Sequence, residues 1–396
     1  MSISFRHLCL ALTLLLFAAV PARAEAPQAS MRDIFAAIVE LLPVSVSEEG
    51  FADPASREKS GKALARLAQA AQALGDHAET RDADFLQRSR SLGNIASRAK
   101  LAFELERFDE TRFAVFQLTQ TCVGCHARLP DAQDSALAER WIDEAGLDEL
   151  VPEERARLYV ATRRFDDALR IYEEVLEDPR VAPFEADVSG LIGEYLAVAL
   201  RVKRDPARAR ETLAAISQRS DAPRYLAVRA EKWARDLAAL LAEPSKSVAP
   251  LARARALSAH SAQWDELPFL RDGLVLDLVA SGILIEWLDA GAPEASSDQI
   301  AEAWYRLAVL DERIASVTAF PRSEVYLEAA LRANPGGALA ARSYERLEEF
   351  VLMDFGAPTV PSLPMLERDR LIELEQLVAA AGSPAARTGE PAPNDQ

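Results

Sequence analysis

The sequence is poor in cysteine and histidine: among 396 residues there are 3 Cys and 4 His. Cys9 lies in an N-terminal segment that we expect to be removed, so the mature chain keeps only Cys122 and Cys125. These two cysteines belong to one short motif, described below. No cysteine therefore remains for a structural disulfide.

Aromatic residues are also scarce, at 7%, whereas 49% of the residues are hydrophobic and Ala and Leu are abundant. This composition favours helices over sheets, and we predict an all-α protein. The C-terminal region contains no Gly-rich phosphate loop, nucleophile elbow or Ser-His-Asp set. Its one histidine, His260, has no cysteine nearby and is interpreted as a surface or packed side chain. We predict no enzyme activity.

Positive charge is in deficit, with 45 Lys and Arg against 62 Asp and Glu, a net charge of −17. This balance argues against binding to nucleic acid or to an anionic membrane and favours basic or neutral partners. The longest internal apolar stretch, 267–288, is interrupted by Arg271, Asp277 and other charged residues. It predicts a buried helix, so we expect no transmembrane segment in the mature chain.

The first 24 residues resemble a secretory signal peptide. Arg6 and His7 precede an apolar run from Leu8 to Val20, and Ala22-Arg23-Ala24 is a small-x-small cleavage site. No cysteine stands at the cleavage point, so a lipid anchor is not expected. We predict that residues 1–24 direct export and that the mature protein is periplasmic.

The segment Cys122-Val123-Gly124-Cys125-His126 has the C-x-x-C-H pattern. This pattern is typical of c-type haem attachment, in which two thiols form thioethers with the haem and the histidine binds the iron. On a helix these three residues occupy positions i, i+3 and i+4 and share one face. A zinc site would need a second cysteine pair, and a dithiol redox motif would need a strand-helix setting. Neither is present, and we predict one haem c bound through Cys122 and Cys125.

The residues around this motif predict four amphipathic helices. We expect them at about 27–42, 53–75, 82–107 and 109–130, with Asp53-Pro54 opening the second, Gly75 ending it and Asp109 capping the fourth. Short connections between such helices favour an antiparallel four-helix bundle over residues 25–130. In that topology the end of the last helix lies beside the start of the first and the end of the second.

Two residues at this end of the predicted bundle could bind the iron from the other side. Met31 lies one turn into the first helix, and His77 is predicted in the turn after the second. A methionine on an apolar stripe also fills cores, and a loop histidine is often only solvated. A third alternative is an open or water-bound sixth position. A thioether ligand raises the reduction potential, a second imidazole lowers it, and an open site binds small ligands.

Together these features resemble the cytochrome c-prime superfamily of four-helix cytochromes, in which C-x-x-C-H lies near the end of the last helix. The resemblance covers residues 25–130 and implies that His126 is the proximal ligand. In low-spin members a methionine near the start of the first helix is the sixth ligand, which corresponds to Met31. His77 departs from that pattern.

Residues 131–135 read as a connector, and helical patterns continue from 136 to 381. The segment 153–179 is similar to a tetratricopeptide (TPR) repeat, with a turn at 163–166 and a matching set of residues: Leu158, Tyr159, Phe165, Ala168, Tyr172, Leu176 and Pro179. No fixed period of about 34 residues runs through the region, so we predict a degenerate TPR-like α-solenoid. The Pro-containing tail, 382–396, is predicted to be disordered.

These observations favour a periplasmic mono-haem electron-transfer protein. Its helical repeats would dock a redox partner or an envelope protein, an inference made by analogy with other solenoids. Two alternatives remain open. The protein could be a haem-based sensor that binds a small ligand, or an envelope scaffold in which the haem is only structural.

Overall fold

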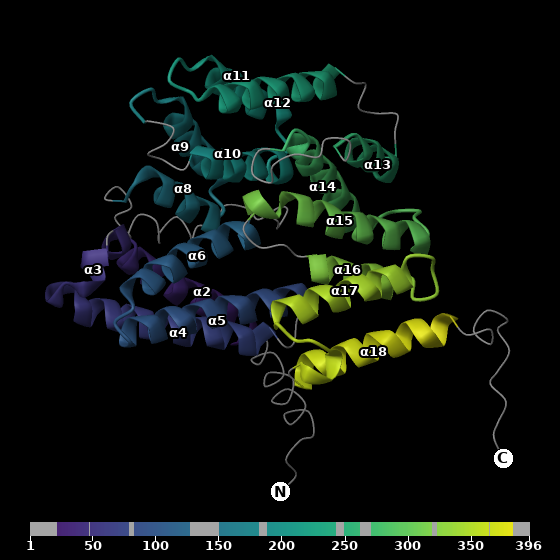
Figure 1. The fold of residues 1–396 in the computed structure, drawn as a ribbon, viewed down its shortest axis with the longest axis horizontal. Coiled ribbons are helices and arrows are strands. Elements are labelled where there is room, and N and C mark those ends of the chain that lie inside the picture. Colours follow the sequence, from purple (N-terminus) through teal and green to yellow (C-terminus); the bar gives the residue numbers. More distant parts are fainter. Residues whose placement is uncertain are drawn as a thin grey trace, which may run out of the picture. The chain divides into compact units, whose positions relative to one another are not determined.

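The structure is a computed structural model. It describes residues 22–46, 48–78, 83–126, 150–181, 188–242, 249–261, 271–318, 323–363 and 365–382. All regular structure within these ranges is helical, which confirms the all-α prediction (Figure 1). The signal peptide, the connector and the tail predicted above lie almost entirely outside the described residues. Among the described helices, none is both long enough and apolar enough to cross a membrane.

The chain divides into two compact units. The first comprises Met1–Cys122 with Asp134–Arg155, and the second comprises Val123–Gln133 with Ala156–Gln396. The domain limits predicted from the sequence, 25–130 and 136–381, stay predictions. Each unit is described by itself below.

The first unit contains the four predicted helices. Its described segments are α2 (Ala22–Leu41), η1 (Pro43–Val46), α3 (Glu48–Ala52), α4 (Pro54–Ala78), α5 (Ala83–Glu104) and α6 (Phe108–His126), whose last residues pass into the second unit. The start of α4 follows the predicted chemistry. Asp53 accepts a hydrogen bond from the backbone N–H of Ala55 through Oδ1 at 3.1 Å, and Pro54 is the first helical residue.

Two details of the helix ends differ from the prediction. Gly75 does not end the second helix, because α4 continues to Ala78, and His77 therefore lies in the last helical turn rather than in a loop. Asp109 is not a cap, because α6 begins at Phe108 and places Asp109 and Glu110 in its first turn. There their charges complement the positive end of the helix dipole.

Helices α4 and α5 pack against each other in opposite directions. Gly61 approaches the ring of Phe103 so closely that a Cβ there would lie 3.3 Å from Cε1. Ten residues further along α4, Ala71 faces Gly93, which lies ten residues earlier on α5. Phe103 also packs edge-on against Phe51 and Phe108, with ring centroids 5.9 and 5.8 Å apart. One end of this unit is therefore built from α3, the start of α4, the end of α5 and the start of α6.

The core of the first unit is mainly aliphatic, with Phe35, Phe51 and Phe103 also buried, and it contains hydroxyl groups. Buried residues that follow the predicted stripes are Ile34, Ile38, Leu41, Leu64, Leu67, Leu74, Leu92, Ile95 and Ala99. Among the residues between 22 and 122 whose burial the structure describes, the buried polar ones are serines and threonines: Ser30, Ser60, Ser89, Thr111, Thr119 and Thr121. Helical hydroxyls bond back to the chain, as Thr121 does to the Gln117 carbonyl at 2.7 Å.

The second unit is a succession of helices. Its described elements are α8 (Pro152–Ala161, beginning in the first unit), α9 (Phe165–Glu177), α10 (Val188–Leu196), the π-helical η3 (Ala197–Val202), α11 (Pro206–Gln218), α12 (Arg224–Ala242), α13 (Pro250–Ser261), α14 (Leu274–Asp289), α15 (Ser297–Thr318), α16 (Ser323–Ala333), α17 (Ala340–Asp354), η5 (Val360–Ser362) and α18 (Met365–Gly382). Sequential helices pack against each other in several pairs: α11 with α12, α13 with α14, α15 with α16, and α16 with α17.

Two predictions about this unit are confirmed at the level of helices. A turn separates α8 from α9 as expected, but it lies at 162–164 rather than 163–166, and Arg163 adopts the left-handed conformation in it, with φ of 65°. The apolar stretch expected to form a buried helix contains α14, in which Asp277 itself is 0% exposed. Asp277 lies in the first turn of this apolar helix, and a charged residue buried there is stable only when it is paired. Arg271 supplies that partner at 2.6 Å.

Candidate functional site

The C-x-x-C-H segment forms the end of α6. The helix is continuous through Cys122, Cys125 and His126, so the three residues occupy positions i, i+3 and i+4 of one helix, as the sequence predicted. Cys122 is half-buried. The side chains of Cys125 and His126 lie outside the described residues. Helix α6 is fixed upstream by the buried Val115 and Leu118, which hold its inner face in the core.

The two candidates for the sixth position are both helical. Met31 lies on α2 and is half-buried, next to the fully packed stripe that begins at Ile34. It is thus less enclosed than a residue that only fills a core. The side chain of His77 is outside the described residues, so the choice between the two ligands stays a prediction.

Four phenylalanines could line a porphyrin or pack in the core, and the structure separates three of them. Phe35 is buried, at 8% exposure, and belongs to the core. Phe113 and Phe116 on α6 are exposed, at 58% and 36%, so the core-packing interpretation is wrong for both. The side chain of Phe85 is not described. The rings of Phe113 and Phe116 are thus exposed on the surface of the helix that carries the motif.

The donor set fits a covalently bound haem c. A single continuous helix provides two thiols and one imidazole at the spacing that this group uses. Among the residues whose side chains are described, no group of three His, Cys, Asp or Glu could hold a metal ion. The prediction of His260 as a packed or surface residue is not tested, because its side chain is not described.

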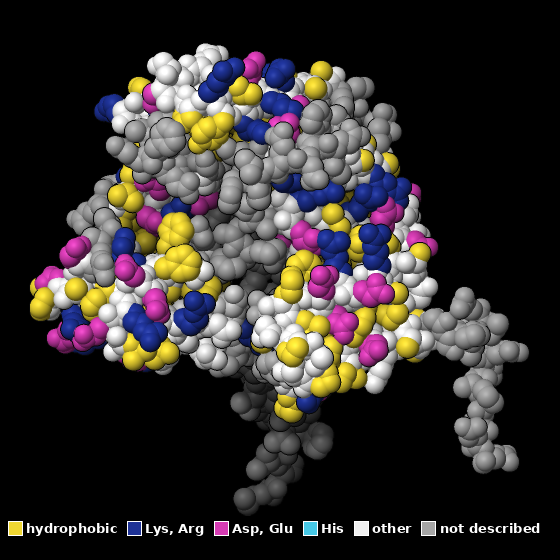
Figure 2. Space-filling model, in the orientation of Figure 1, with side chains coloured by type: hydrophobic (Ala, Val, Ile, Leu, Met, Phe, Trp, Pro, Cys, Tyr) yellow, Lys and Arg dark blue, Asp and Glu magenta, His cyan; other side chains and the backbone are white. Residues whose placement is uncertain are grey.

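A second candidate site lies wholly within the second unit and was missed by the sequence reasoning. It is a cavity of about 860 Å³ between α13, α15, the end of α16 and α17. On the face drawn in Figure 2, basic side chains gather over α15 and α17. The signal was present in the sequence as arginines at helical spacing, Arg306 and Arg313 on α15 and Arg342 and Arg346 on α17. Without the packing of the helices, nothing indicated that the two pairs face each other.

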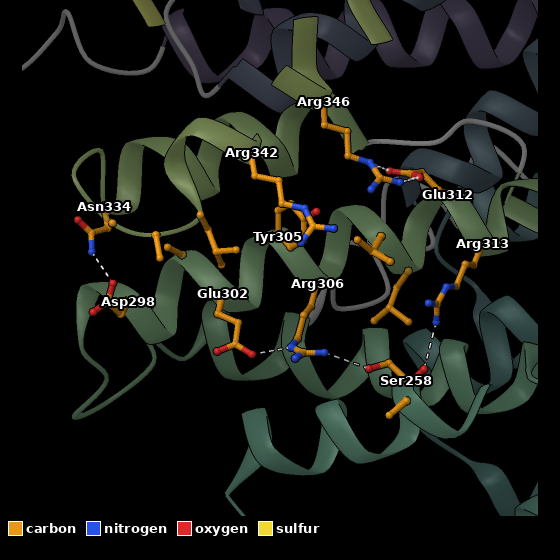
Figure 3. Close-up of a pocket in the computed structure, with 17 residues that line it drawn as sticks. Ser258, Asp298, Glu302, Tyr305, Arg306, Glu312, Arg313, Asn334, Arg342 and Arg346 are labelled. Atoms are coloured by element: carbon orange, nitrogen blue, oxygen red, sulfur yellow. Dashed lines mark hydrogen bonds and ion pairs between the residues drawn. The ribbon is translucent and has the colours of Figure 1, made fainter. Parts of the chain in front are cut away.

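Carboxylates hold two of these four arginines in place (Figure 3). Arg306 donates to Glu302 at 2.7 Å, and the Nε of Arg346 donates to Glu312 at 2.9 Å. Burial raises the pKa of Glu312 although Arg346 acts in the opposite direction. The pKa of Glu302 is lowered, chiefly by its hydrogen bond with Arg255 outside the cavity. Ion pairs between arginines and carboxylates therefore form part of the cavity wall.

Comparisons with protein-family models, with curated proteins and with solved structures found no match for this chain. The function is therefore argued from the residues and from the geometry described above.

Proposed function

We propose that this protein is a periplasmic c-type cytochrome that carries one haem and transfers electrons, and that its second unit docks a protein partner. The observation that carries the proposal is the C-x-x-C-H motif on the continuous helix α6. An irregular loop would not hold the side chains of Cys122, Cys125 and His126 on a common face. The helix places all three residues on one face.

Three residues would hold the group. Cys122 and Cys125 would form the two thioether bonds, and His126 would bind the iron. The haem would supply a centre that accepts and releases one electron. The chain's part is to fix the group on a rigid helix and to surround it with apolar packing, which disfavours extra charge and thereby tunes the reduction potential.

The arrangement of α2 and α6 supports placing Met31 near the motif. The Nε of Arg112 on α6 donates to the carbonyl of Ser45, just after α2, at 3.1 Å. Ser45 lies in η1, four residues after α2 ends at Leu41. Cys122 follows Arg112 by ten residues and Met31 precedes Leu41 by ten, each a rise of about 15 Å along its α-helix. If the two helices run in opposite directions, Met31 would lie near the level of Cys122 and the end of α6.

A similar argument keeps His77 in consideration. Arg66 on α4 forms an ion pair with Glu40 on α2 at 2.9 Å. Nine residues further along each helix, in opposite directions, are Gly75 and Met31. His77 lies about half a turn beyond Gly75, so both candidate ligands would stand at the same end of the unit.

The second unit supports a docking role as a degenerate TPR-like solenoid. Several of its helices pack in sequential pairs, and α8 and α9 are joined by a short turn, an arrangement compatible with one repeat. Large apolar side chains are exposed on its surface, among them Tyr225 and Val228 on α12, each 55% exposed. Residues three apart on a helix lie on one face, where they can contact a partner together.

The first test is to measure whether the exported protein contains haem. We expect the mass of the purified mature chain to exceed that of the polypeptide by one haem, and a reduced-minus-oxidised visible spectrum to show c-type bands. A Cys122→Ser/Cys125→Ser variant, exported from the same cells, should be colourless. A colourless wild-type chain with both thiols unmodified would overturn the proposal.

The sixth ligand can be tested with matched pairs of variants. If Met31 is the ligand, Met31→Ala should shift the visible spectrum and lower the potential, while Met353→Ala, at a residue 64% exposed on α17, should change neither. If His77 is the ligand, His77→Ala should shift the spectrum and His260→Ala should not. Rapid stoichiometric binding of carbon monoxide by the wild-type ferrous protein would indicate an open site and the sensor alternative.

A further inference from the structure

The cavity between α13, α15 and α17 is large enough for a small molecule. Its volume of about 860 Å³ falls in the range of ligand pockets in proteins. Figure 3 shows side chains from both α15 and α17 pointing into it, with Arg342 and Tyr305 near the middle. Val309, Leu310 and Leu339 add an apolar part to its wall. The cavity thus combines charged and apolar surfaces.

Three of its four arginines are held by partners within the protein. Arg306 is paired with Glu302, Arg346 with Glu312, and Arg313 donates to the carbonyl of Ser258 at 3.1 Å. Arg342 differs from them, because it forms no ion pair with the described residues. Its guanidinium lies over the ring of Tyr305, 5.4 Å from the centroid. A guanidinium held on an aromatic face keeps its donors available for an anion.

The hydroxyl of Tyr305 is the second unusual group. Tyr305 is 7% exposed, and its Oη is buried without a hydrogen bond of good geometry among the described residues, although the Arg346 side chain lies close enough to interact with it. A buried polar atom that lacks a well-formed hydrogen bond costs free energy, so such atoms in native proteins usually meet a ligand or a bound water. This hydroxyl lines the same cavity that Arg342 enters. The two groups can therefore donate to one oxyanion.

We propose that this cavity binds a small organic anion, with its carboxylate or phosphate head-group between the Arg342 guanidinium and the Tyr305 hydroxyl. Arginine offers donors in a fixed fork that matches either head-group. The apolar side chains Val309, Leu310 and Leu339 would contact the carbon chain of the ligand. Four arginines and three carboxylates line the cavity, so its wall carries a net positive charge although the chain as a whole carries −17. The proposal is independent of the haem.

Isothermal titration calorimetry of the mature full-length protein with three probes tests it. Hexanoate and hexyl phosphate carry the two head-groups on the same chain, and hexylammonium carries the opposite charge. We expect at least one of the two anions to bind at a single site and hexylammonium not to bind. Binding of hexanoate alone would identify a carboxylate ligand, and binding of hexyl phosphate alone a phosphate ligand.

Two substitutions link that binding to the cavity. Arg342→Gln should weaken it at least about tenfold, as expected when a charge-assisted hydrogen bond to the ligand is lost. Tyr305→Phe removes one neutral hydroxyl and should weaken it about threefold. Arg368→Gln is the matched control, because Arg368 is a surface arginine on α18 outside the cavity. It should bind the anion as the wild type does.

Two results would overturn the proposal. One is that neither anion binds with a dissociation constant below about 10 mM. The other is that Arg342→Gln binds as tightly as the wild type.

Arg342 is exposed, so we expect its substitution to leave the fold intact, which the thermal midpoint checks. If that midpoint falls, Arg342→Lys retains the charge but not the fork and should still weaken binding. The Cys122→Ser/Cys125→Ser variant should bind the anion normally, so failure of the haem proposal would be seen separately.

Discussion

The two units bury different chemistry. In the described part of the first unit, the buried polar side chains are hydroxyls of Ser and Thr; those of Thr111, Thr119 and Thr121 bond to backbone carbonyls three or four residues earlier in the chain. In the described part of the second unit, six charged side chains are buried: Arg157, Glu194, Arg201, Asp277, Asp311 and Glu328. Hydroxyl groups that bond within their own helix do not determine which helices pack together. Buried charged groups can determine it, because their partners commonly come from another element.

The pairs in the second unit join helices that are far apart in sequence. Arg157 on α8 donates to Glu194 on α10 at 3.0 Å, and Tyr172 on α9 donates to the same carboxylate at 2.8 Å. Arg201, in the π-helical η3, reaches Asp311 on α15 at 3.1 Å. We infer that these contacts fix the order of packing in a region whose apolar helices alone could pack in several ways. The first unit relies on the shape of its aliphatic core.

The largest effect should come from breaking a buried pair in the second unit. Asp311→Ala leaves the guanidinium of Arg201, whose side chain is 4% exposed, without its carboxylate. Removing one partner of a buried pair costs about 3–5 kcal/mol. We expect the free energy of unfolding, measured with urea, to fall by that amount.

The double variant Arg201→Met/Asp311→Leu separates the cost of the unpaired charge from the value of the pair. Replacing both charges by apolar residues should recover most of the loss, because no buried charge remains. Asp369→Ala, at an exposed pair on α18, should cost less than about 1 kcal/mol. Equal losses for Asp311→Ala and Asp369→Ala would show that the buried pair has no special role.

A smaller effect should appear as a dependence of stability on pH. Burial opposes ionisation of Glu328, but Arg370 and Arg332 outweigh it and hold its pKa below the usual 4.5. The folded state therefore binds fewer protons at this site than the unfolded state. This contribution to stability is complete above about pH 4.5 and is lost as the pH falls through the lowered pKa. Urea unfolding of wild type and Glu328→Gln between about pH 3 and 7 measures the difference.

Glu312 provides the control of opposite sign. Burial raises its pKa, so its folded state binds more protons and its contribution decreases as the pH rises through the interval above 4.5. Glu312→Gln should therefore change the slope at higher pH than Glu328→Gln does. If both variants flatten the curve in the same interval, the opposite signs assigned to the two carboxyls are wrong.

The contrast between the units also explains what the sequence could predict. The four N-terminal helices follow from spacing and stop signals, since apolar residues such as Leu64 and Leu67 repeat with the helical period and are buried. The helical setting of Cys122 and Cys125 follows in the same way. Gly75 misled the prediction, because a glycine near the expected end of a helix is a common stop but the packing of α4 continues past it.

The second unit was harder to predict for a physical reason. Acidic residues on helices usually face solvent, so the sequence reasoning assigned Asp and Glu in this region to surfaces. Glu194, Asp311 and Glu328 are instead buried against arginines of other helices. The cavity arginines were also missed, because charged residues on helices usually face solvent. They are Arg306, Arg313, Arg342 and Arg346. Arg201 and Asp311 are more than a hundred residues apart in the chain. Their pairing therefore leaves no local sequence pattern.

The smallest change in stability is expected from a substitution in the first unit. There the intrinsic helix propensity of the new residue should determine the change, because no ion pair is altered. Gly75 lies inside α4, and a Cβ added there would meet no atom within 4 Å. Alanine is favoured over glycine in a helix interior, so Gly75→Ala should stabilise the protein by about 1 kcal/mol. Gly50→Ala is the matched control, because its Cβ would overlap the carbonyl oxygen of Val44 and should destabilise the fold. A higher thermal midpoint for Gly75→Ala and a lower one for Gly50→Ala would support the packing described for both glycines. A lower midpoint for Gly75→Ala would instead mean that this position requires glycine, as the end of a helix does.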